Sequence, residues 1–83
     1  MNTLALLILE HLQKAQGNMI PDGTLFIELK GMTRPASTQL DWKKAITFLT
    51  KKGLIGTDRD AITEEQKHYI EEAGTLFLRR RNK

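Results

Sequence analysis

The change of hydrophobic spacing at Gly53 is the feature that most constrains how this chain can fold. Before it, 38-TQLDWKKAITFLTKK-52 has apolar residues at helical spacing, whereas after it the apolar residues stand in two pairs, at 54–55 and 61–62. The segment between the pairs, 56-GTDRD-60, is rich in residues that favour turns. This pattern predicts a helix that runs directly into a short β-hairpin.

A helix start is predicted directly after this hairpin. The segment 63-TEEQ-66 has the spacing of a capping box, and its two glutamates would stand in the first turn, where the helix dipole favours acids. Downstream residues share one face of a helical wheel and form an apolar stripe: Tyr69, Ile70, Ala73, Leu76 and Phe77. We therefore expect a last helix over about 63–79.

The first segment, 3-TLALLILEHLQKAQGN-18, is expected to be a helix with a buried stripe. Its apolar residues recur at helical spacing, and Thr3 can cap the start. Gly17 and Asn18 tolerate the left-handed conformation that commonly ends a helix. His11 lies beside the stripe, where we expect a histidine at the edge of the core with a hydrogen-bond partner.

The segment 19–32 fits two interpretations. Asp22 can cap a short helix with apolar residues on one side, but 24-TLFIEL-29 would also pass as a strand. We favour the helix and expect it to end at Gly31. A loop should follow at 33–37, because Pro35 disfavours a helical conformation at the preceding residue.

The predicted helix at 38–52 has two unlike faces. Thr38 and Asp41 approximate a capping box at its start. One face is apolar and consists of Trp42, Ala45, Ile46 and Leu49, and we expect Trp42 to anchor the core. The opposite face is basic and includes Leu40 together with Lys43, Lys44, Thr47 and Lys51.

Positive charge is concentrated in two segments of the chain. Residues 30–52 contain six lysines or arginines and a single aspartate, and residues 79–83 read RRRNK, although the net charge of the whole chain is only +3. A small domain can form a local electropositive surface in this way without an extreme total charge. We expect such a surface on the helix at 38–52 and a basic tail at 79–83.

Composition excludes several classes of protein. The chain has 83 residues, no cysteine and two histidines, so no disulfide, metal site or other cofactor is expected, and the core depends on packing alone. It has no glycine-rich phosphate loop and no cluster of catalytic residues, so we do not expect an enzyme. No segment approaches the ~20 apolar residues of a membrane span and no signal-peptide pattern is present, which favours a cytoplasmic protein.

The order of these elements resembles the winged helix-turn-helix superfamily, including the MarR-like and PadR-like bacterial regulators. The likeness is in 49-LTKKGLI-55, which ends a helix, and in 62-ITEEQKHYI-70, which opens the next one. It implies one domain over 1–83, mainly α with a small β-hairpin (α+β), with a three-helix core, a short wing and a C-terminal helix. It also implies that 38–52 match the recognition helix and 54–63 the wing.

Two functions are compatible with this sequence. The first is a small transcriptional regulator that binds double-stranded DNA, in which lysines contact phosphates while Gln39, Thr47 and Arg34 read bases. Its candidate DNA-binding residues are Arg34, Thr38, Gln39, Lys43, Lys44, Thr47, Lys51 and Arg59. The second is a winged-helix protein–protein interaction module that does not bind DNA. The acidic 58-DRD-60 keeps this alternative open, since a wing that binds phosphate is expected to be basic.

A symmetric homodimer through the last helix is also expected. The apolar stripe over 69–77 outlasts the three-helix body against which it can pack. A two-fold pair would place two recognition helices about one DNA turn, ~34 Å, apart. Alternatively, Leu6 and Leu9 of the first helix could cover Leu76 and Phe77 within a monomer.

Overall fold

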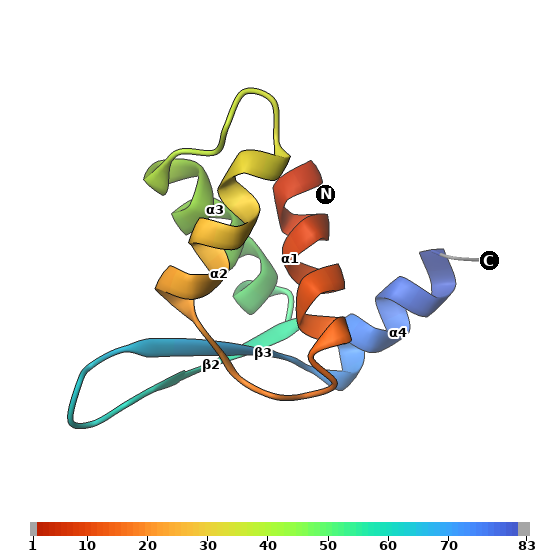
Figure 1. Ribbon diagram of the computed structural model, residues 1–83. Helices are drawn as coiled ribbons and strands as arrows, with labels where there is room; N and C mark the ends of the chain where they lie inside the picture. Colours follow the sequence, from red (N-terminus) through yellow and green to blue (C-terminus); the bar gives the residue numbers. More distant parts are fainter. Residues whose placement is uncertain (1, 82–83) are drawn as a thin grey trace.

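The computed structural model describes residues 2–81 and shows an α+β fold, as the sequence predicts (Figure 1). Its helices are α1 (Thr3–Lys14), α2 (Asp22–Leu29), the 3-10 helix η1 (Lys30–Met32), α3 (Gln39–Lys51) and α4 (Glu72–Arg81). Its strands are β1 (Ile20–Pro21), β2 (Ile55–Arg59) and β3 (Gln66–Ile70). No helix between residues 2 and 81 is long and apolar enough to cross a membrane.

The three strands form one antiparallel sheet in the order β1-β3-β2. Ile20 lies opposite His68, and Ile55 lies opposite Ile70. Helices α1, α2 and α3 lie on one side of the sheet, and the distal half of the β2–β3 hairpin extends beyond them (Figure 1). The core fills the space between these helices and the sheet, and α4 packs beside α1.

Helix α1 buries Leu4, Ile8 and Leu12 of the predicted stripe and also Ala5 and Leu9, which lay outside it. Its cap is Asn2 and not Thr3. The Asn2 side chain accepts a hydrogen bond from the backbone N–H of Ala5 at 2.8 Å, which satisfies one of the amides that a helix start leaves free. Gln16 and Gly17 then take positive φ values of 54° and 87°, so the helix stops as expected near Gly17.

The segment 19–32 is helical, and the favoured interpretation is confirmed. Asp22 starts α2 but makes no capping hydrogen bond, so its predicted capping role is wrong. The helix ends at Leu29 and continues as η1, which contains Gly31. The two residues before α2 form β1, a strand that the sequence analysis did not predict.

Helix α3 has the predicted capping box and the predicted buried face. Asp41 Oδ2 accepts from the Thr38 backbone N–H at 3.0 Å, and Thr38 Oγ1 accepts from the Asp41 backbone N–H at 3.1 Å. The hydrogen bond from the Thr38 backbone, followed by the Thr38 side chain, lowers the pKa of the Asp41 carboxyl. Trp42 is 4% exposed, which confirms it as a core anchor.

We predict that Thr38→Ala lowers the free energy of unfolding by ~1 kcal/mol, because it leaves an amide of the first turn of α3 without its side-chain acceptor. Urea denaturation followed by circular dichroism measures the change. Thr47→Ala is the matched control: Thr47 is exposed within α3, and alanine favours a helix interior, so stability should be unchanged or slightly higher. An equal loss in both variants would contradict the capping role.

The hairpin is longer than predicted, and the predicted helix start at Thr63 is wrong. Asp60 Oδ1 accepts from the backbone N–H groups of Ile62 and Thr63, at 2.8 and 3.1 Å, and forms a tight turn. Glu64 takes a positive φ of 59°, which is incompatible with a first helical turn. The hairpin therefore spans 55–70 instead of 54–63, and the last helix begins at Glu72.

The predicted apolar stripe of the last helix is divided between two elements. Tyr69 and Ile70 belong to β3, and only Ala73, Leu76 and Phe77 belong to α4. Within α4, the buried residues are Gly74 and Leu78, while Leu76 is 40% exposed. The arginines of the predicted basic tail extend α4 to Arg81, and the rest of that tail lies outside the described residues.

Gly74 marks a close approach between α4 and the end of the α3–β2 connection. A Cβ atom at this position would overlap the backbone carbonyl oxygen of Leu54 and would lie 2.8 Å from Cγ1 of Ile70. The same Leu54 carbonyl accepts the backbone N–H of Glu71 at 3.0 Å. The absence of a side chain at Gly74 therefore permits α4 to sit directly on the body of the fold.

Candidate nucleic-acid interface

The outward face of α3 is the basic helix face that the sequence predicts, and its side chains are exposed in the structure. Lys43, Lys44, Thr47 and Lys51 are all exposed, on the side of α3 opposite the buried Trp42 and Leu49. Leu40 and Phe48 share this face and are 61% and 38% exposed. The surface is therefore a mixture of ammonium groups and apolar side chains.

A groove of about 480 Å³ separates this helix from the hairpin. Its helical wall includes Gln39, Lys43, Thr47 and Lys51, and its hairpin wall includes Thr57 from β2 and Gln66 from β3. The remaining lining residues are Asp22, Trp42, Ile46 and Thr50. The groove thus has two lysines along its helical wall, uncharged hydrogen-bonding groups along its hairpin wall, and the carboxylate of Asp22 in its lining.

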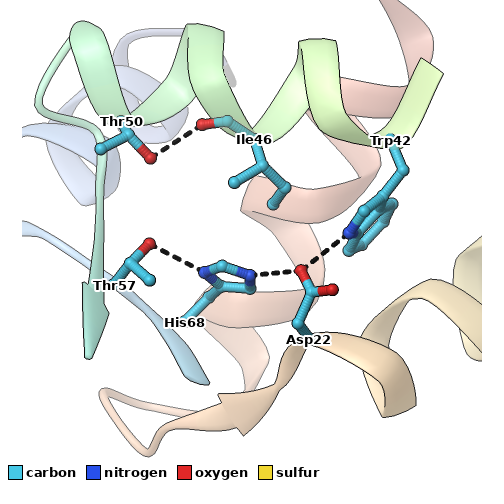
Figure 2. A network of polar contacts seen from close by, with 6 residues as sticks. All are labelled: Asp22, Trp42, Ile46, Thr50, Thr57 and His68. Atoms are coloured by element: carbon cyan, nitrogen blue, oxygen red, sulfur yellow. Dashed lines mark hydrogen bonds and ion pairs between the residues drawn. The ribbon is translucent and has the colours of Figure 1, made fainter. Parts of the chain in front are cut away.

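A hydrogen-bond network lies beside this groove and joins four elements (Figure 2). Oδ1 of Asp22, at the start of α2, accepts from Trp42 Nε1 at 2.8 Å and from His68 Nε2 at 2.6 Å. On the other side of the ring, His68 Nδ1 lies 2.9 Å from Thr57 Oγ1. The network therefore links α2, α3, β2 and β3 through a single imidazole and a single carboxylate.

The direction of these hydrogen bonds follows from the chemistry of each group. A carboxylate oxygen accepts, so His68 Nε2 carries the proton that it shares with Asp22. In the neutral imidazole Nδ1 is then an acceptor, and the Thr57 hydroxyl donates to it. His68 is completely buried, whereas the Asp22 side chain is 36% exposed, so the network reaches from the core to the groove.

The groove brings together four of the predicted DNA-binding residues: Gln39, Lys43, Thr47 and Lys51. Lys44 lies on the outer face of α3, beside Leu40 and Phe48. Thr38 is exposed, but its hydroxyl oxygen caps α3.

The other two predicted residues lie away from the groove walls. Arg34 is exposed in the segment between η1 and α3. This segment is held by its own hydrogen bonds: Thr33 Oγ1 lies 2.6 Å from Ser37 Oγ, and the Ser37 backbone N–H donates to the Lys30 carbonyl at 2.9 Å. Arg59 is exposed at the end of β2, opposite Gln66.

Sequence reasoning missed the hairpin side of the site. Thr57 and Gln66 were not candidates, because 63–66 was interpreted as a helix start and only two residues were assigned to the second strand. In the structure His68 is buried between half-buried neighbours, but the letters 66-QKHYI-70 do not alternate between polar and apolar residues, so they carry no local signal for β3.

Both histidines have carboxylate partners. His11 Nε2 lies 2.7 Å from Glu28 Oε2, with a side chain 33% exposed, which confirms the predicted histidine at the core edge. His68 pairs with Asp22, as described above. Over residues 2–81, no group of three or more histidine, cysteine, aspartate or glutamate side chains is placed to hold a metal ion.

Comparisons with known proteins give no family for this chain. No protein-family model, no curated protein and no solved structure matches it. The features that bear on function are therefore the surface of α3, the groove and the hairpin.

Proposed function

We propose that this protein is a winged-helix domain that binds double-stranded DNA, with α3 as its recognition helix and the β2–β3 hairpin as its wing. The single observation that carries the proposal is the exposed basic face of α3 beside the groove that separates it from the hairpin. The element order supports it, since α3 follows the helices α1 and α2 and runs directly into the hairpin. The resemblance to winged helix-turn-helix regulators leads to the same assignment of 38–52.

Helix α3 has the size and chemistry that a major groove accepts. An α-helix fits the ~12 Å width of the major groove, and lysines on its flanks reach the phosphates. In this arrangement Lys43, Lys44 and Lys51 bind the phosphate backbone of the DNA. Gln39 and Thr47 face bases, and the exposed Leu40 and Phe48 offer apolar contacts of the kind that thymine methyl groups accept.

In this proposal the wing contributes mainly through the part of the hairpin that lies next to α3. Gln66 lines the groove next to α3, and its side-chain amide can donate to a phosphate oxygen, whereas the Thr57 hydroxyl already donates to His68. Further out, Arg59 stands between Asp58 and Asp60, so the distal hairpin has no excess of positive charge. Affinity should therefore depend on α3 and Arg34 more than on the tip of the wing.

A second candidate function is a protein-binding winged helix. The specific observation in its favour is the far end of the hairpin, where Ile62 is 92% exposed among acidic residues. Such a surface is poorly suited to a polyanion but acceptable to a basic protein partner. The two candidates differ in whether the basic face of α3 has a nucleic-acid ligand.

We predict micromolar-order binding to random duplex DNA at ~50 mM salt, with affinity that falls steeply as salt rises, because each neutralised phosphate releases counterions. Fluorescence anisotropy at two salt concentrations measures it. Replacing Lys43, Lys44 and Lys51 together by glutamate should abolish binding and leave the fold intact, since all three side chains are exposed. Circular dichroism and thermal unfolding check the fold.

The matched control makes the same change in charge at another place. Arg79, Arg80 and Arg81 are exposed at the end of α4, away from α3 (Figure 1), and their joint replacement by glutamate should reduce binding far less. Equal losses in the two triple variants would show that binding follows net charge and not the face of α3. Absence of binding by the unmodified chain at ~50 mM salt would favour the protein-binding alternative.

A further inference from the structure

The tip of the hairpin combines one apolar side chain with several acids. Ile62 is 92% exposed, which is the highest value among the exposed large apolar side chains of residues 2–81. Glu64 and Glu65 follow it and are exposed as well. Asp60 holds this turn in shape, and hydrogen bonds from the backbone N–H groups of Ile62 and Thr63 lower the pKa of its carboxyl. We refer to residues 60–65 as the acidic tip.

The exposed side of α4 has the opposite character. Leu76 is 40% exposed, and one helical turn later Arg79 and Arg80 are exposed next to it. The opposite side of the same helix is buried through Gly74 and Leu78. We refer to Leu76, Arg79 and Arg80 as the basic face of α4.

We propose that copies of this chain associate head to tail, with the acidic tip of one copy seated on the basic face of α4 of the next. Each surface has an exposed aliphatic side chain and an excess of one charge. The tip has Asp60, Glu64 and Glu65 near Lys67, and the face of α4 has Arg79 and Arg80 against Glu72, so the two excess charges are opposite in sign. The hairpin tip and α4 lie at opposite ends of the molecule, whose longest extent is 41 Å (Figure 1). The two surfaces therefore meet only between molecules.

This arrangement differs from the symmetric pair that the sequence suggested. A two-fold dimer would place α4 against α4 and leave the acidic tips of both copies without a partner surface. A heterologous contact joins unlike surfaces. It leaves one tip and one α4 face free at the two ends of the assembly, so further copies can add there. Self-association should then continue beyond a dimer as the protein concentration rises.

The contact is small and therefore weak. A tip of about six residues covers less than the ~1,000 Å² that stable interfaces usually bury, and exposed ion pairs contribute little each. A dissociation constant on the order of 0.1–1 mM is expected, and it should rise with salt. The association does not require DNA and is tested without it.

Sedimentation equilibrium from tens of micromolar to ~1 mM tests the proposal. The weight-average mass of the unmodified chain should rise above twice the 9.5 kDa of one copy. A tip variant (Ile62→Ser, Glu64→Gln, Glu65→Gln) and a helix variant (Leu76→Ser, Arg79→Gln, Arg80→Gln) should each remain at 9.5 kDa. All six substituted side chains are exposed, so both variants should keep the fold.

Mixing the two variants gives the decisive result. The helix variant keeps a native tip and the tip variant keeps a native α4, so the mixture should form a 1:1 complex and stop there. A tip variant that still forms dimers alone indicates a symmetric α4 pair and overturns the proposal. A mixture that stays monomeric, or an unmodified chain that stays at 9.5 kDa, also overturns it. Ile27→Ser in α2 removes another exposed aliphatic side chain and should change nothing.

Discussion

Replacing Asp22 by alanine should lower the free energy of unfolding by about 3 kcal/mol. The substitution removes the acceptor of two hydrogen bonds, those from Trp42 Nε1 and His68 Nε2. A buried donor left without a partner costs about 1–3 kcal/mol, and both donors belong to buried residues. Water can reach the vacated site in part, because the Asp22 side chain is 36% exposed, which keeps the loss below the sum of two full penalties.

This loss is large for a domain of 83 residues, whose total stability is expected to be about 4–12 kcal/mol. Guanidinium denaturation measures it. Asp22→Asn is the companion variant, because its amide oxygen can still accept hydrogen bonds, and it should lose roughly half as much. Alanine and asparagine variants with the same stability as the unmodified protein would show that the network does not contribute.

The second large effect is expected at Gly74. By helix propensity alone, Gly74→Ala in α4 should stabilise the protein by up to ~1 kcal/mol. The structure predicts the opposite, because the new Cβ would overlap the Leu54 carbonyl oxygen and crowd Ile70. Overpacking of this kind typically costs about 1–3 kcal/mol, and α4 must shift away from the body to relieve it.

Gly23→Ala is the matched control for this prediction. Gly23 is also helical, but a Cβ built there meets no atom within 4 Å, so helix propensity alone should act and stability should rise slightly. Thermal unfolding of both variants gives the comparison. A stabilising Gly74→Ala would contradict the close packing of α4 on the α3–β2 connection.

Local signals predicted most of the helical part of the fold. The capping box at Thr38 and the apolar face of α3 depend on side chains within one or two turns, and the structure confirms both. The 3.6-residue period also predicts a buried side of α1, and Leu4, Ile8 and Leu12 are buried, but the period did not identify Ala5 and Leu9, which are buried too. The basic face of α3 follows from the same wheel, because its residues lie opposite Trp42.

The strand β3 could not be predicted in the same way, because what stabilises it is distant in sequence. The pattern at 63–66 fits a capping box. In the structure, however, the backbone N–H groups of Ile62 and Thr63 donate to Asp60 Oδ1 and form a turn instead of a helix start. Strand β3 then pairs with β1, which is only two residues long. No local rule connects Ile20 with His68, so the hairpin wall of the groove was missed.

The pairing of β1 with β3 has a consequence for the order in which the candidate site can form. Asp22 meets His68 across 46 residues, and the rest of α2 and all of α3 and β2 lie between them. While the chain is being synthesised, the first three helices can pack before β3 emerges from the ribosome, but the groove then has only one wall. Until Gln66–Ile70 has emerged and paired, the basic face of α3 stands beside an unfinished sheet, and Asp22, which can already accept from Trp42, still lacks its bond with His68.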